Sequence, residues 1–205
     1  MFNQLFVSSV SACFELQNTH PYYSPEKYMV YLNGAAVEEK DSNVFSLFGL
    51  EPDTEYTVAV SCCEGELRFR TLPESGCVNV KELGAKGDGV SDDTYYVQMA
   101  IDSCPKNGRV VIPEGSYYVR PIVLKSDMTL EIKKGGELLG DIVEEHYPYV
   151  PAKIEYDDGT EDILATWEGN PYPCHQSFVS AYKQSNIKIV GEGAINGNAD
   201  NSTWW

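Results

Sequence analysis

The sequence lacks any apolar stretch approaching the about 18 residues that a membrane-spanning helix requires, so a helical membrane protein is excluded. Basic residues are also scarce. Fifteen Lys and Arg stand against 31 Asp and Glu, which gives a formal net charge of −16. A surplus of this size repels nucleic acids and anionic membranes at long range, so neither is an expected partner. An acidic ligand would need a local basic site to overcome the same field.

Two further patterns are missing. No Lys or Arg precedes the first short apolar stretch, which alternates as a strand does, so the start does not have the pattern of a signal peptide. The expected location is therefore cytoplasmic, with a secreted or periplasmic protein as the alternative. His and Cys never show the paired spacing of zinc ligands, so no metal or other cofactor is expected.

The cysteines are interpreted as free thiols in a reducing compartment, with a disulfide framework as the alternative. Adjacent Cys62 and Cys63 are expected on opposite faces of one strand. The six positions are Cys13, Cys62, Cys63, Cys77, Cys104 and Cys174.

Residues 1–75 have the pattern of a small β-sandwich built from short alternating strands. One such strand, "KYMVYLNG", ends in the turn signal Asn33-Gly34. In "GLEPDTEYTVAV", Tyr56 has the position of a corner tyrosine whose hydroxyl bonds back to the backbone upstream. The segment from Phe6 to Leu72 resembles a fibronectin type III module, with another β-sandwich as the alternative. Such modules space or dock other domains, so this resemblance indicates no reaction.

A linker, "TLPESGCVNV", leads into a second domain that starts near Val78, and we assign residues 76–205 to that domain. Its opening segment, "GAKGDGVSDDTYYVQMAIDSC", contains an aspartate cluster. We interpret the cluster as the start of a helix, with Ser91 as N-cap and Asp92 and Asp93 in the first turn. Adjacent carboxylates on a helix diverge, which disfavours a catalytic pair. Calcium also fits poorly, because Val90 stands where a calcium loop needs an oxygen ligand.

The rest of that segment predicts one buried helical stripe, and short strands with short turns follow it. The stripe comprises Val97, Ala100, Ile101 and Cys104. The strands include "RVVIP", "YYV", "IVL", "MTLEI", "ELL", "IKIV" and "AIN". Strands this short suit either a sandwich or the coils of a solenoid, and the pattern alone does not separate the two.

An ordered set of motifs in the second domain resembles the N-terminal part of glycoside hydrolase family 28, the polygalacturonases and their relatives. The set comprises the opening segment, "GRVVIPEGSYYVRPIVLKSDMTLEIKKGGELLGD", "YPYV", "TWEG" and "NIKIVGEGAINGN…TWW". The resemblance implies an all-β fold class, in which the first coils of a right-handed parallel β-helix follow the sandwich and one short α-helix caps the coils. The opening segment alone is less specific, because phage tail spikes share it.

The resemblance also shows what these 205 residues lack. The family motifs N-T-D, G-H-G and R-I-K are missing, and D-D occurs only at Asp92-Asp93 and Asp157-Asp158, in a predicted helix start and a polar turn. Asn196 replaces the Asp of the family's I-D-G step. No catalytic residue is carried over. The expectation is that the chain stops after the first coils, which would leave Trp204 and Trp205 as exposed apolar surface.

A long insertion, Glu144 to His175, is the segment expected to contact sugar. Long loops are often functional, and aromatic side chains suit the apolar faces of pyranose rings. The candidate substrate-binding residues are Trp167, Glu168, Tyr172 and His175; the alternative is that such side chains only seal the loop onto the coils.

The resemblance implies that the complete protein hydrolyses α-1,4-galacturonosyl linkages with inversion, and that its partner is a pectic polysaccharide or oligogalacturonide. The chain alone is expected to be inactive. The rivals are a non-catalytic carbohydrate-binding or adhesion protein, a tail-spike-like protein, and a lyase. Endo or exo action, the pectic substrate and the oligomeric state stay open.

Overall fold

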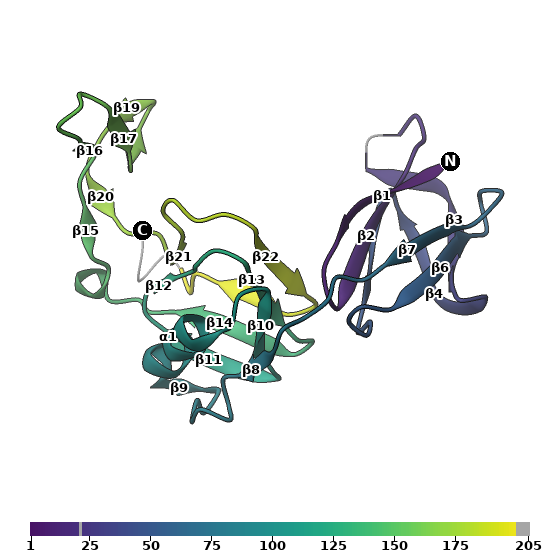
Figure 1. The fold of residues 1–205 in the computed structure, drawn as a ribbon, viewed down its shortest axis with the longest axis horizontal. Helices are drawn as coiled ribbons and strands as arrows, with labels where there is room; N and C mark the ends of the chain where they lie inside the picture. Colours follow the sequence, from purple (N-terminus) through teal and green to yellow (C-terminus); the bar gives the residue numbers. More distant parts are fainter. Residues whose placement is uncertain (21, 200–205) are drawn as a thin grey trace. The chain divides into compact units, whose positions relative to one another are not determined.

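The computed structural model describes residues 1–20 and 22–199, which divide into two compact units. The first comprises Met1–Gly76 with the short segment Asn107–Arg109, and the second comprises Cys77–Lys106 and the chain from Val110 onward. Strands dominate both units (Figure 1). No helix within the described ranges has the length and apolarity needed to cross a membrane. Trp204 and Trp205 lie outside the described residues.

The first unit is a seven-stranded antiparallel β-sandwich. One sheet has the order β1-β2-β5 and the other has the order β4-β3-β6-β7. The strands are β1 (Phe2–Val7), β2 (Ser11–Leu16), β3 (Tyr23–Leu32), β4 (Ala35–Ser42), β5 (Val44–Phe48), β6 (Glu55–Val60) and β7 (Leu67–Arg70).

Alternating side chains of both sheets form the sandwich core. The Phe14 ring lies 5.3 Å from the rings of both Phe45 and Phe69, measured between centroids. The corner prediction is confirmed, because the Tyr56 hydroxyl accepts a hydrogen bond from the Glu51 backbone N–H at 2.9 Å. The predicted Asn33-Gly34 turn between β3 and β4 is confirmed too, since both residues have positive φ.

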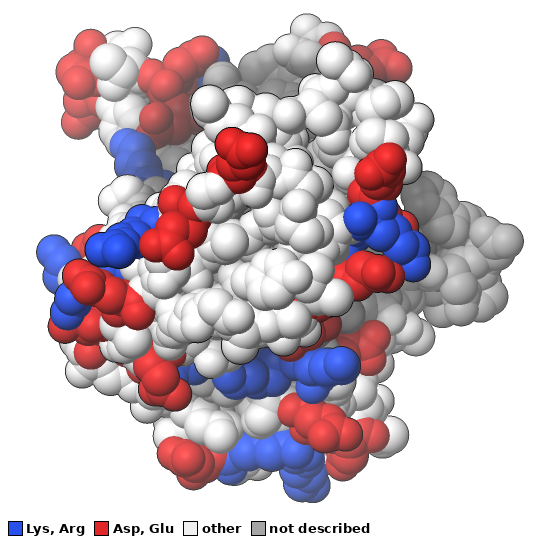
Figure 2. Space-filling model, turned by 90° about the vertical axis from the view of Figure 1, so that its right-hand side faces the viewer, with Lys and Arg blue, Asp and Glu red and all other residues white. Residues whose placement is uncertain are grey.

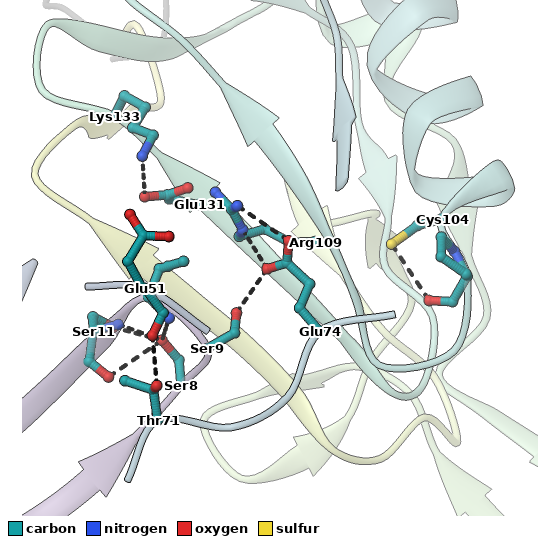
Figure 3. Close-up of polar contacts among 12 residues, drawn as sticks. Ser8, Ser9, Ser11, Glu51, Thr71, Glu74, Cys104, Arg109, Glu131 and Lys133 are labelled. Atoms are coloured by element: carbon teal, nitrogen blue, oxygen red, sulfur yellow. Dashed lines mark hydrogen bonds and ion pairs between the residues drawn. The ribbon is translucent and has the colours of Figure 1, made fainter. Parts of the chain in front are cut away.

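Hydroxyl groups satisfy the buried backbone at the strand ends of the sandwich. Figure 3 shows Ser8 beside Ser11, and the Ser8 hydroxyl oxygen accepts hydrogen bonds from the backbone N–H groups of Val10 and Ser11. The Thr71 hydroxyl donates to the Glu51 carbonyl oxygen at 2.6 Å. These contacts meet the requirement that buried polar groups find partners.

The prediction for Cys62 and Cys63 is wrong. Strand β6 ends at Val60, and the Cys63 N–H donates to the Val60 carbonyl oxygen at 3.2 Å, so both cysteines lie in the turn that follows. Opposite faces apply only to a strand that continues. All six cysteines of the chain are free thiols.

The second unit winds as the first coils of a right-handed parallel β-helix, which confirms the predicted fold class. Its parallel sheets have the orders β22-β13-β10-β8, β23-β14-β11-β9 and β12-β21. The coil elements are β8 (Cys77–Asn79), β9 (Asp88–Asp92), α1 (Thr94–Ser103), β10 (Gly108–Ile112), β11 (Gly115–Val119), β12 (Ile122–Val123), β13 (Met128–Ile132), β14 (Gly136–Gly140), β21 (Val179–Ser180), β22 (Ile187–Gly191) and β23 (Ala194–Asn196).

Apolar side chains fill the interior of the coils. Leu130 and Leu138 are fully buried there, and each lies in register with a residue of the next coil. Helix α1 packs against β8, β11 and β12. Its predicted stripe is confirmed, because all four members are buried: Val97, Ala100, Ile101 and Cys104.

Several exposed charges lie beside a charge of the opposite sign. On the face shown in Figure 2, basic and acidic side chains alternate around an uncharged central area. Within the first unit, for example, Lys27 contacts Glu39 at 3.0 Å and Arg70 contacts Asp53 at 2.8 Å. Such exposed pairs contribute little to stability, because water screens them.

Candidate functional site

The aspartates of the opening segment do not form a paired site. Asp88 accepts hydrogen bonds from the backbone N–H groups of Ser91 and Val90, which lower its pKa to about 2. Asp93 is buried and accepts from the N–H groups of Lys86 and Gly87, both at 2.8 Å. These carboxylates have structural partners in their own loop, but the predicted placement of Asp92 and Asp93 in the first helical turn is wrong, because Asp92 ends β9 and α1 has no acidic residue in its first turn.

The predicted role of Ser91 as N-cap is wrong. Ser91 lies in β9, and its hydroxyl donates to Asp88 at 2.8 Å instead of capping the helix. Helix α1 begins at Thr94 with Asp93 as its N-cap residue, and Asp93 makes no side-chain cap bond. The Asp93 carboxylate is already used by the loop backbone, which is why it does not turn back to the helix.

The predicted insertion leaves the coil between β14 and β21. We refer to residues 144–178 as the excursion (Figure 1, green). Its strands pair antiparallel in three short ribbons, β15 with β20, β16 with β17, and β18 with β19. The elements are η1 (Glu144–His146), β15 (Tyr149–Val150), β16 (Lys153–Glu155), β17 (Glu161–Ile163), β18 (Thr166–Trp167), β19 (Asn170–Pro171) and β20 (Cys174–His175).

A buried carboxylate, Asp141, anchors the root of the excursion. It accepts hydrogen bonds from the Tyr118 hydroxyl at 2.6 Å and the Val143 N–H at 2.8 Å, and it contacts His146 Nδ1 at 2.5 Å. Burial alone would raise the pKa of Asp141, but these hydrogen bonds outweigh burial and hold the pKa below its usual value. The Tyr147 hydroxyl donates to the Asp141 carbonyl oxygen, which fixes the next residues of the chain.

A second cluster fastens the excursion to the loop before β22. We call it the Asp162 cluster, and it comprises Tyr156, Asp162, Tyr182 and Lys183. Both tyrosine hydroxyls donate to Asp162, and Lys183 Nζ lies 2.7 Å from the same carboxylate. Lys183 Nζ also lies 4.5 Å from the centroid of the Tyr156 ring. The hydrogen bond from Lys183, followed by those from the tyrosines, holds the pKa of Asp162 well below its usual range.

The excursion and the coil wall border an open recess of about 520 Å³. Its coil side is formed by β12, β21 and the residues that follow β21, and its other side is formed by the excursion. Apolar and uncharged polar side chains predominate. The lining residues are Val123, Val150, Ile163, Leu164, Cys174, His175, Gln176, Ser177, Val179, Ser180, Ala181 and Tyr182.

The structure places the four predicted sugar-contacting residues in two locations. His175 lines the recess, where its Nδ1 lies 2.8 Å from the Tyr147 carbonyl oxygen and its Nε2 lies 3.0 Å from Glu144. Trp167 and Glu168 lie at the hairpin turn between β18 and β19, and Tyr172 follows β19. Trp167 is 69% exposed and Tyr172 is 57% exposed.

Sequence reasoning missed Asp162, Tyr182 and Lys183. Asp162 is 20 residues from Tyr182 in the sequence, and no spacing rule joins a ribbon residue to a residue of the coil wall. Only the path of the excursion brings them together. In the part of the chain that the structure describes, no group of three or more His, Cys, Asp or Glu side chains has the arrangement of a metal site.

Comparison with known proteins supports the fold and the family resemblance. Residues 77–153 match the family described as rhamnogalacturonase A/epimerase, pectate lyase-like. The chain is 36% identical over 121 residues to the exo-poly-α-D-galacturonosidase of Dickeya chrysanthemi, a match that covers 59% of this chain and 19% of that protein. It is 38% identical over 147 residues to the plasmin and fibronectin-binding protein A of Streptococcus pneumoniae, covering 63% of this chain and 20% of that protein.

Among solved structures, the family 28 exopolygalacturonase of Yersinia enterocolitica superposes on 97% of this chain and 40% of its own, with a TM-score of 0.62 and 24% identity. That likeness shows the fold. The chain spans about a fifth of the length of the two curated relatives. In its motifs, its family match and its fold, the chain resembles the N-terminal part of the glycoside hydrolases of family 28.

Proposed function

We propose that this chain is part of a glycoside hydrolase that cleaves α-1,4-galacturonosyl linkages of pectin or oligogalacturonides. The observation that carries the proposal is the 36% identity to an exo-poly-α-D-galacturonosidase, in a chain whose coils have the matching fold. The proposed reaction is inverting hydrolysis, in which one carboxylic acid protonates the leaving oxygen and a carboxylate activates water on the opposite face. The catalytic carboxylates are placed on coils beyond these 205 residues, because the family motifs are missing here.

The excursion is the part of this chain that we propose contacts the sugar. Trp167 and Tyr172 present exposed aromatic faces, on which pyranose rings can stack. Glu168 lies beside Trp167 at the same turn, and His175 borders the recess. The open aromatic faces support contact with sugar better than the alternative, in which these rings seal the loop onto the coil.

A second function is favoured by one observation. The 38% identity to a plasmin and fibronectin-binding protein suits a non-catalytic binding protein in which the coils act as scaffold. The first function predicts that the complete protein cleaves pectic chains, whereas the second predicts binding without cleavage.

The test is an assay of the complete gene product beside the 205-residue chain, with polygalacturonate as substrate. We expect the complete product to release reducing ends without ultraviolet-absorbing unsaturated products, and the 205-residue chain to release none. Binding without cleavage by the complete product would favour the scaffold function. Unsaturated products would identify a lyase, and cleavage by the chain alone would show that the catalytic residues are misplaced in the proposal.

A further inference from the structure

The recess at the base of the excursion has the size and the lining of a small-ligand site. Its volume of about 520 Å³ lies within the range of about 300–1,000 Å³ that such pockets occupy in proteins. Apolar side chains that remain open to solvent border it, with Val123 45% exposed and Ile163 46% exposed. An apolar surface of this kind is stabilised when the apolar face of a ligand covers it.

The polar groups of the recess are uncharged or already paired. Gln176 Nε2 donates to the Ser180 hydroxyl at 3.0 Å, and the imidazole of His175 lies between the Tyr147 carbonyl and Glu144. The Tyr182 hydroxyl donates to Asp162. Such groups can exchange hydrogen bonds with sugar hydroxyls, which both donate and accept.

Charge at the rim of the recess is unfavourable for an anion. Lys183 lies next to the lining residue Tyr182, and its charge is compensated by Asp162 at 2.7 Å. Lys153 lies in register with the lining residue Ile163, and its ammonium group contacts Glu155 and Glu161. The lining, within the described residues, contains no Lys or Arg. Asp162 and Glu144 are carboxylates that contact lining residues, and the chain as a whole carries a net charge of −16. A carboxylate placed in the recess would therefore find no Lys or Arg in the lining, while the excess negative charge of the chain disfavours it.

We propose that the recess binds one uncharged pyranose ring, such as a methyl-esterified galacturonosyl residue or a neutral sugar of a pectic side chain, and discriminates against the free uronate. The inference rests on the proposed function, which supplies a pectic chain as the ligand, and it assigns a substrate class to this part of the excursion. The valine and isoleucine side chains cover one face of the ring, while Gln176, Ser180 and Tyr182 meet its hydroxyl groups.

The first experiment measures binding to the 205-residue chain by saturation-transfer NMR and titration calorimetry. The three ligands are trigalacturonate, its fully methyl-esterified form and a neutral galactotriose. Comparison of the two uncharged ligands shows whether the recess prefers a methyl-esterified galacturonosyl residue or a neutral sugar of a pectic side chain. We expect at least one uncharged ligand to bind about tenfold more tightly than trigalacturonate at low salt, with the gap narrowing as salt is added. Equal or tighter binding of trigalacturonate, or no binding of either uncharged ligand, would overturn the proposal.

Two variants place the binding in the recess. Val123→Trp fills the space beside β12 and is expected to reduce the affinity for the uncharged ligand about tenfold or more. The matched control, Val90→Trp, adds the same side chain at a position that is 84% exposed and outside the lining, and it should leave the affinity unchanged. An equal loss of affinity in both variants would show that the uncharged ligand does not bind in the recess.

Ser177→Lys tests the charge argument directly. Ser177 is an exposed residue of the lining, so the new ammonium group is expected to raise the affinity for trigalacturonate about fivefold while that for the uncharged ligand stays within about twofold. A purely structural effect would change both affinities together. Cleavage by the complete gene product is measured separately, so failure of the recess and failure of the proposed reaction give different results.

Discussion

The coil and the excursion of the second unit are held together by different forces. In the coil, parallel ladders of five residues join β11 to β14 and β13 to β22, and inward side chains such as Tyr117, Leu130 and Leu138 are fully buried. In the excursion, the paired strands have two or three residues and most side chains are exposed. Hydrophobic burial stabilises the first region, whereas the Asp141 contacts and the Asp162 cluster position the second.

The difference teaches that the two regions respond to different changes. Loss of apolar volume acts on the whole coil, because each coil buries its face against the next. Loss of a polar contact in the excursion acts locally, because few apolar contacts couple the ribbons to the core. Substitutions chosen in pairs test this contrast.

The largest expected effect is in the coil interior. Leu130→Ala removes a fully buried side chain of β13 and is expected to destabilise the unit by about 2–5 kcal/mol in urea unfolding. Ile189→Ala is the matched control, since Ile189 lies in register with Leu130 on β22 but is 48% exposed. If Ile189→Ala lowers the free energy of unfolding as much as Leu130→Ala does, burial of the side chain does not determine its contribution to stability.

The next effect is at the root of the excursion. Asp141 is itself buried directly after β14, so Asp141→Ala, which removes the acceptor of the partly buried Tyr118 hydroxyl and of the Val143 N–H, is expected to lower the free energy of unfolding by about 1–3 kcal/mol. Asp157→Ala, a change at an exposed turn position of the excursion, serves as control and should leave the unfolding free energy unchanged within about 0.5 kcal/mol.

The stabilising contribution of Asp141 has a defined pH dependence. Its pKa is lower in the folded state than in the unfolded chain, so the stabilisation is complete above the unfolded value of about 4 and is lost as pH falls through the folded value. We therefore expect the stability difference between the native chain and Asp141→Asn to shrink below about pH 4. A difference that stays constant down to the acid limit would show that the carboxylate charge is not involved.

A smaller and local effect is expected in the Asp162 cluster. Tyr182→Phe removes one hydroxyl donor to Asp162, so hydrogen exchange of the ribbon formed by β16 and β17 should become faster while the melting temperature stays the same. Tyr172→Phe, which alters a hydroxyl outside the cluster, is the matched control. Faster exchange throughout the coil after Tyr182→Phe would contradict the division between the two regions.

The smallest effect on stability is expected for Trp167→Ala. Its side chain is 69% exposed, so the unfolding free energy should change by less than about 0.5 kcal/mol. If Trp167 contacts sugar as proposed, the same change should lower the affinity of the chain for pectic oligosaccharides. Unchanged affinity for every ligand would remove Trp167 from the proposed contact surface.

Local patterns predicted those elements that are held by local forces. Alternation placed the coil strands, and helical periodicity placed the buried stripe of α1, because both patterns report directly on which side chains leave water. The errors lie at the ends of elements, in one case because a polar group had a competing partner. Ser91 bonds to Asp88 rather than to the helix, and Cys62 lies in a turn because the strand ends at Val60. Periodicity contains no information about such competition.

By itself the sequence pattern determined that this is a mainly β chain with one helix, that a sandwich-like segment precedes the helix, and that short strands and an aromatic insertion follow it. Hydrophobic spacing carries that information, because the period at which apolar residues recur shows which face of a local helix or strand leaves water. The family resemblance, not the pattern, indicated that those strands form coils. Only the tertiary structure decided that Asp162, Tyr182 and Lys183 meet, and that the excursion borders a recess with β12 and β21. Those contacts join residues tens of positions apart, and their formation depends on the path that the folded chain takes.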